Sequence, residues 1–280
     1  MMKKRLNYPY LFLLAVSFLI VGGAWKLGYF EPNKEPVSLP AEETLPDSDT
    51  TSDPPDTKIT EPPERERSIE EPAEEPGPKL PTFFEADRSY FDDALFIGDS
   101  RTVGLYEYGD LGNAVVLADS GMSVYKIFKH SFPLDTGEKM TLEEILSQRQ
   151  FGKVYIMLGI NELGYSFEQT VDVYKDMVEQ IESKQPDALI FLQANLHITE
   201  KKSATSPIYN NANINRFNQE VQDMADSMHR FYLDANELFD DENGNLSVEY
   251  TVDESHVLGK YYAGWVDWIL RHAVTFHDEI

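Results

Sequence analysis

Apolar residues form five short runs between residues 94 and 235, and amphipathic segments separate them. Each run is nearly continuously apolar, as expected of strands that are buried on both faces of a parallel sheet. The runs are Ala94–Gly98, Ala114–Ala118, Lys153–Gly159, Ala188–Ala194 and Phe231–Ala235. We therefore predict five buried strands.

The intervening segments carry helix signals. Thr141 is followed by Glu144 and Ser166 by Gln169, which is the spacing of a capping box at a helix start. Apolar residues recur at helical spacing after Ser166, within residues 211–228, and in the segment YAGWVDWILRHAV near the C-terminus. These segments predict amphipathic helices that cover the strands.

Strands that alternate with helices predict a three-layer α/β/α fold around a five-stranded parallel sheet. In such sheets, ligands bind in the crevice outside the carboxyl ends of the strands. Polar residues that follow a predicted strand are therefore the first candidates for a functional site.

The start of the sequence has the pattern of an export signal. Lys3, Lys4 and Arg5 precede residues 6–25, which hold no charged residue. An apolar span of about 20 residues crosses a bilayer as a helix, and basic residues before it keep the N-terminus in the cytoplasm. We predict that residues 1–30 form a single-pass anchor, with the rest on the extracellular face of a bacterial cell membrane. The alternative is a cleaved signal peptide and a secreted protein.

Residues 31–80 are rich in Pro, Glu, Asp, Ser and Thr and almost free of large apolar residues. Such a segment cannot bury enough surface to offset the entropy lost on ordering. We predict a disordered, acidic, Pro-rich linker, followed by a globular domain over residues 81–280.

Acidic residues outnumber basic ones. The net charge of the 280-residue chain is −25, and residues 81–280 alone hold 15 Lys and Arg against 34 Asp and Glu. Nucleic-acid binding needs a basic surface, so we expect no nucleic-acid partner. The sequence has no cysteine, which excludes disulfides, thiolate metal ligands and a cysteine nucleophile.

Candidate catalytic residues follow several of the predicted strands. Ser100 lies just past the first strand, Gly121 after the second and Asn161 after the third, while Asp253 and His256 come late in the chain. A serine nucleophile needs a base and a group that orients the base. Acyl transfer also needs donors at the developing oxyanion. We therefore predict a triad of Ser100, His256 and Asp253. The predicted oxyanion donors are the N–H groups of Ser100 and Gly121 and the side-chain amide of Asn161.

These residues resemble the four sequence blocks of the SGNH (GDSL-type) hydrolases. The Gly-Asp-Ser at 98–100 is similar to the first block, Gly121 to the second, Asn161 to the third, and Asp253 with His256 to the last. The blocks occur in the family order across nearly the whole domain. The resemblance implies a flavodoxin-like sheet, a shallow serine esterase site and no cofactor or metal.

Two positions depart from the family pattern. Glu162 stands where the third block usually has Asp, and Glu254 stands where the last block often has Gly. Neither change removes a catalytic group. The first is expected to alter how the Asn161 loop is braced, and the second places another carboxylate beside His256 or narrows the site.

The predicted function is that of a membrane-anchored, extracytoplasmic serine esterase that removes small acyl groups, chiefly acetyl, from cell-envelope glycans through an acyl-enzyme. One alternative is an O-acetyltransferase that uses the same serine to acylate a glycan. Another is a non-catalytic module that binds the envelope.

Other polar residues are weaker candidates. His197 follows the fourth predicted strand, so it is either a substrate contact or a loop residue. His272 lies among apolar helix residues and is expected to be structural. The stretch DDENGN at 240–245 lacks the ligand spacing of a calcium loop, and its Asn243-Gly244 pair favours a tight hairpin turn.

Overall fold

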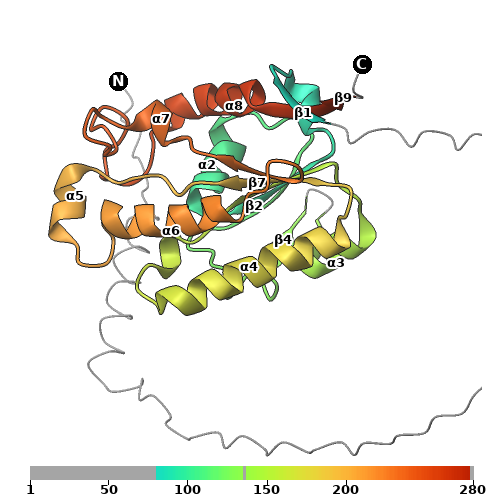
Figure 1. Cartoon of the computed structure of the whole chain (residues 1–280), viewed down its shortest axis with the longest axis horizontal. Coiled ribbons are helices and arrows are strands. Elements are labelled where there is room, and N and C mark those ends of the chain that lie inside the picture. Colours follow the sequence, from blue (N-terminus) through green and yellow to red (C-terminus); the bar gives the residue numbers. More distant parts are fainter. Residues whose placement is uncertain (1–79, 135–136, 278–280) are drawn as a thin grey trace, which may run out of the picture. The chain divides into compact units, whose positions relative to one another are not determined.

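The computed structural model describes residues 80–134 and 137–277 (Figure 1). The predicted anchor over residues 1–30 and nearly all of the predicted linker over residues 31–80 lie outside these residues. Within the described ranges, no helix combines the length and hydropathy that a bilayer-crossing segment requires.

The five predicted strands form one parallel sheet, which confirms the predicted fold class. The strands are β2 (Ala94–Gly98), β3 (Val115–Ala118), β6 (Lys153–Met157), β7 (Leu189–Gln193) and β8 (Arg230–Leu233). Their order in the sheet is β3-β2-β6-β7-β8, and all four neighbouring pairs are parallel. This is the strand order of flavodoxin-like sheets, in which the first strand lies between the second and the third.

Helices cover both faces of the sheet. On one face, Leu95 and Ile97 belong to a core with buried residues of α3 (Leu142–Gln148), α4 (Phe167–Lys184) and α6 (Asn211–Asp223). On the other face, Ala94 and Phe96 belong to a core with buried residues of the helices η1 (Arg88–Phe91), α2 (Ser100–Tyr108), α7 (Asn236–Phe239) and α8 (Tyr262–Arg271). Figure 1 shows α3 and α4 on one side of the sheet and α8 on the other.

Three aromatic rings stack across the centre of the sheet. Phe96, Tyr155 and Phe191 are in register on β2, β6 and β7. Their ring centroids are 4.4 Å and 4.5 Å apart, and the rings are nearly parallel. This row fixes the relative positions of the strands whose ends carry the candidate site.

One of the two predicted capping boxes forms. The Thr141 side chain accepts from the N–H of Glu144, and the Glu144 carboxylate accepts from the N–H of Thr141. Ser166 does precede α4, but its side chain makes no capping hydrogen bond, so the second box is wrong. The Ser166 carbonyl instead accepts from the Thr170 hydroxyl.

Four short strands outside the main sheet were not predicted. β1 (Leu80–Phe84) pairs antiparallel with β9 (Ala273–His277), and β4 (Ser131–Pro133) pairs antiparallel with β5 (Lys139–Thr141). The last helix therefore ends at Arg271 rather than running on to Val274. The partner of β9 lies at the other end of the domain, so no local pattern indicates the pairing.

Candidate active site

The register of the sheet brings the candidate loops to one edge. Gly98, the last residue of β2, is level with Ala118 of β3 on one side and Met157 of β6 on the other. Ser100 comes two residues after Gly98. The loops with Gly121 and Asn161 leave the sheet next to it, because they follow the neighbouring strand ends.

Ser100 is the first residue of α2. The Asp99 side chain caps the helix by accepting from the N–H of Arg101 at 2.9 Å. Because Ser100 opens the helix, its own N–H has no acceptor within the helix, and the helix dipole makes this end favourable for negative charge. The backbone therefore presents a free donor where the serine begins the helix.

A hydrogen-bond chain joins the three residues of the predicted triad. The Ser100 hydroxyl Oγ lies 2.9 Å from Nε2 of His256. On the other side of the ring, His256 Nδ1 lies 2.7 Å from Oδ2 of Asp253. A carboxylate only accepts, so Nδ1 carries the hydrogen and leaves Nε2 free to accept the serine proton. The side chains of His256 and Asp253 are 46% and 51% exposed, so this arrangement lies at the surface.

The other oxygen of Asp253 is held by its own loop. Oδ1 accepts from the N–H groups of Ser255 at 3.0 Å and His256 at 2.7 Å, and from the Thr251 hydroxyl at 3.1 Å. Partial burial acts to raise the pKa of Asp253. The hydrogen bonds from the His256 ring and these backbone groups outweigh burial and hold the pKa well below its usual value. Asp253 is therefore a fixed anion beside the imidazole.

The loops with Gly121 and Asn161 are joined to each other. Asn161 lies in the helical turn η2 (Ile160–Glu162), and its Nδ2 donates to the carbonyl of Met122 at 2.9 Å. An amide nitrogen carries two hydrogens, so one remains for a ligand. Gly121 has a φ of +73°, in the left-handed region that glycine favours. The chain thus turns at Gly121 in a way that most other residues adopt only at a cost.

Glu162 braces the same loop, which explains one departure from the family pattern. It is 2% exposed, and its Oε1 accepts from the N–H of Val124 at 2.6 Å. Together, Asn161 and Glu162 fix the chain on both sides of Ser123. Burial raises the pKa of Glu162 to about 7, the hydrogen bond from Val124 opposes the rise, and the nearby Asp99 carboxyl adds to it.

Glu254 does not turn its carboxylate toward His256. It accepts from Nζ of Lys201 at 2.7 Å, on the short helix α5 (Glu200–Thr205). Its φ is +68°, in the left-handed region that glycine favours. The neighbouring Lys202 Nζ donates to the Ser255 hydroxyl and lies 3.5 Å from the Asp253 carbonyl. Sequence reasoning missed this contact, because α5 lies about 50 residues before the loop that it holds.

The weaker candidates have structural roles. His197 is buried, and its ring lies 2.7 Å from Asp240 Oδ2 and 2.6 Å from Asn215 Oδ1, so it is not exposed to substrate. The His272 ring lies 2.8 Å from the Trp268 carbonyl. Gly244 forms a turn with a φ of +74°. In the part of the chain that the structure describes, no group of three or more acidic or histidine side chains could hold a metal ion.

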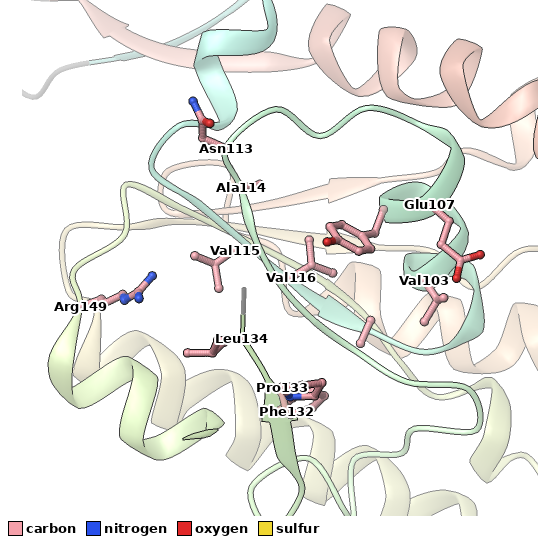
Figure 2. Close-up of a pocket in the computed structure, with 12 residues that line it drawn as sticks. Val103, Glu107, Asn113, Ala114, Val115, Val116, Phe132, Pro133, Leu134 and Arg149 are labelled. Atoms are coloured by element: carbon pink, nitrogen blue, oxygen red, sulfur yellow. The ribbon is translucent and has the colours of Figure 1, made fainter. Parts of the chain in front are cut away.

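A cavity of about 420 Å³ lies along the exposed edge of the sheet at β3 (Figure 2). Figure 2 shows Val115 and Val116 between residues of α2 on one side and Phe132 to Leu134 on the other. Apolar residues dominate its lining, and no residue of the predicted triad or oxyanion hole lines it. The hydrogen-bonded serine therefore lies outside this cavity.

Comparisons with known proteins identify a matching family. Residues 96–258 match the GDSL-like Lipase/Acylhydrolase family. No curated protein matches the sequence.

Several solved structures are similar. A GDSL-like lipase from Bacteroides thetaiotaomicron is 16% identical, with a TM-score of 0.48, over 66% of this chain and 88% of that chain. The acetyl xylan esterase AlAXEase is 15% identical, with a TM-score of 0.48, over 63% of this chain and 96% of that chain. The acetylxylan esterase Axe2 from Geobacillus stearothermophilus is 14% identical, with a TM-score of 0.43, over 64% of this chain and 94% of that chain.

The family match covers more than half of the chain. It includes all five residues of the predicted triad and oxyanion hole. The chain belongs to the GDSL-like lipase/acylhydrolase family and is a carboxylic ester hydrolase.

Proposed function

We propose that this protein is an extracytoplasmic serine esterase that removes small acyl groups, chiefly acetyl, from glycans of the cell envelope. The observation that carries the proposal is the hydrogen-bond chain from the Ser100 hydroxyl through His256 to Asp253. A serine, an imidazole and a carboxylate in this order form the arrangement that activates a hydroxyl for acyl transfer.

In the first half of the reaction, Ser100 Oγ attacks the ester carbonyl carbon and its proton passes to His256 Nε2. The carbonyl oxygen becomes an oxyanion, and the imidazolium is stabilised by the Asp253 carboxylate. When the C–O bond to the alcohol breaks, Nε2 returns the proton to the alcohol oxygen. The acyl group remains on Ser100 as an ester.

In the second half, water attacks the acyl carbon and gives one proton to His256 Nε2. The bond to Ser100 Oγ then breaks, Nε2 returns the proton to the serine, and the carboxylic acid leaves. In both halves, we propose that three donors stabilise the oxyanion by hydrogen bonds. They are the N–H of Ser100, the N–H of Gly121 and the remaining amide hydrogen of Asn161. Donors that are fixed before the reaction stabilise the developing charge without reorganising.

The substrate class is supported by the openness of the site. About half of the His256 side chain is exposed, and the apolar cavity of Figure 2 is not lined by the triad. A short acyl group on a bulky, solvated alcohol suits such a site better than a long fatty acid does. The export pattern of residues 1–30 supports a position among envelope glycans.

The test is ester hydrolysis by the full chain and by Ser100→Ala. The account predicts that p-nitrophenyl acetate turnover falls by about 10⁴-fold or more when the nucleophile is lost, and by about 10²–10³-fold in Asn161→Ala. Ser147→Ala is the matched control, because the side chain of this exposed serine donates to the Glu143 carbonyl of its own helix. Equal turnover by Ser100→Ala and the unchanged protein would refute the proposal.

A further inference from the structure

Large apolar side chains are exposed next to the loop that carries Asn161. Tyr165 is 65% exposed, and Ile208 and Tyr209 are each 41% exposed. Tyr125 lies against Tyr165. We call Tyr125, Tyr165, Ile208 and Tyr209 the tyrosine ledge. Clustered apolar surface on a soluble domain marks a binding site more often than isolated residues do.

The four residues are contiguous, although they come from three separate segments. The rings of Tyr125 and Tyr165 stack with centroids 5.4 Å apart and an interplanar angle of 29°. A methyl carbon added at Gly164 would lie 3.4 Å from Ile208, so Ile208 packs beside the chain that leads into Tyr165. Burial raises the pKa of Tyr209, and the nearby Glu162 and Tyr165 add to the rise.

The ledge is held in place before any ligand arrives. The Tyr125 hydroxyl lies 2.9 Å from the hydroxyl of Thr170 on α4. The N–H of Tyr209 donates to the Ser206 hydroxyl at 2.8 Å, and the Ile208 carbonyl accepts from Nδ2 of Asn213 at 2.8 Å. A preorganised surface loses little conformational entropy on binding, so more of the contact energy appears as affinity.

Two residues of the ledge adjoin the loops that carry Gly121 and Asn161. Tyr125 belongs to the loop that starts at Gly121, and the N–H of Tyr165 donates to the carbonyl of Glu162, the residue after Asn161, at 2.8 Å. A ligand that rests on the Tyr165 ring is therefore beside the loops that carry the proposed oxyanion donors, Gly121 and Asn161.

We propose that the tyrosine ledge is a subsite that stacks the pyranose ring of an uncharged, ester-bearing glycan. The inference rests on the proposed function, since it names what holds the alcohol part of the substrate. A sugar ring has an apolar C–H face and a polar rim, which complement the apolar face and polar tip of tyrosine. A fatty chain on this open ledge would remain largely in water. The acidic excess of residues 81–280 disfavours an anionic glycan.

The experiment compares two esters that differ in whether they carry a ring. Tyr165→Ala, Tyr165→Phe and Tyr209→Ala are made in the full chain and assayed by pH-stat on acetylated xylotetraose and on ethyl acetate. Tyr106→Ala is the matched control, because Tyr106 is 54% exposed and lines the sheet-edge cavity instead. Removal of one stacked ring is expected to lower kcat/KM for the acetylated sugar by roughly tenfold, mainly through KM.

Activity on ethyl acetate is expected to change by less than about twofold in every ledge variant, and Tyr165→Phe is expected to retain the wild-type kcat/KM on both substrates. Equal losses on both esters in Tyr165→Ala, or a loss on the sugar in Tyr106→Ala alone, would overturn the inference and leave the serine chemistry standing.

A binding measurement tests this inference independently of the proposed esterase activity. Calorimetry with acetylated xylotetraose is performed on Ser100→Ala, which cannot turn it over, and on Ser100→Ala combined with Tyr165→Ala. The inference predicts that affinity falls by roughly tenfold in the double variant, whether or not the unchanged protein hydrolyses esters. Equal affinity of the two variants contradicts it.

Discussion

Glu162 places a buried carboxyl group under the loop with Gly121, and its titration links pH to stability. Its pKa rises from 4.5 to about 7 in the folded protein. Between these values the folded state binds more protons than the unfolded state, so the free energy of unfolding falls as pH rises from about 4.5 to about 7. The contribution of Glu162 to this fall is at most about 3 kcal/mol.

We expect Glu162→Gln to flatten this part of the curve of unfolding free energy against pH, measured by urea unfolding. Burial also raises the pKa of Asp99, which acts in the same direction in both proteins, so the difference between the two curves reports Glu162 together with its interaction with Asp99. Glu179→Gln, at an exposed position of α4, is the control and should reproduce the wild-type slope. An unchanged slope in Glu162→Gln would show that this carboxyl group does not titrate as described.

At the scale of elements, α5 serves as a support for the loop that carries Asp253 and His256. Lys202 donates to the Ser255 hydroxyl and lies near the Asp253 carbonyl, whereas the adjacent Lys201 pairs with Glu254 and is itself 81% exposed. An exposed ion pair contributes little, but a half-buried lysine with two acceptors restrains the backbone of the loop.

We therefore expect Lys202→Met to lower kcat by about tenfold with a smaller effect on KM, because the His256 ring loses its fixed orientation. Lys201→Met is the matched control and should remain within about twofold of wild type. The measurement is steady-state hydrolysis of p-nitrophenyl acetate, with Lys202→Arg expected to restore most of kcat. Equal kcat values for Lys202→Met and Lys201→Met would show that Lys202 does not position the loop that carries His256.

The elements that could be predicted are those with a local signal. The strands β2, β3, β6, β7 and β8 are mostly apolar, because helices cover both faces of the sheet. β1 could not be predicted, because it is mostly exposed and pairs with residues at the opposite end of the domain. Ser166 has the sequence of a helix cap but does not use its side chain for it.

The same distinction holds for the site, where some residues have a local sequence signal and others do not. The Gly-Asp-Ser at 98–100, Asn161 and Asp253 with His256 are visible as motifs in the sequence, and their order suggests one site. The brace from Glu162 to Val124, the support from Lys202 and the stacking of Tyr125 on Tyr165 are contacts between distant segments. No spacing in the sequence indicates these contacts, because each depends on how distant loops pack together in the folded protein.

At the scale of the whole molecule, the described residues form a sheet with helices on both faces, and the predicted site lies at its carboxyl edge. The predicted anchor over residues 1–30 and the linker over 31–80 remain predictions, and with them the extracellular position of the enzyme. The serine chemistry does not depend on them, because the hydrogen-bond chain lies entirely within residues 100–256.

The most direct test of that chemistry is covalent labelling of the full chain by a fluorophosphonate, with the adduct located by mass spectrometry of peptides. We expect one phosphonylated serine, Ser100, and labelling that slows by about 10³-fold or more in His256→Ala, since the base no longer takes the serine proton. An adduct on a different serine, or labelling of Ser100 at the same rate without His256, would contradict the account.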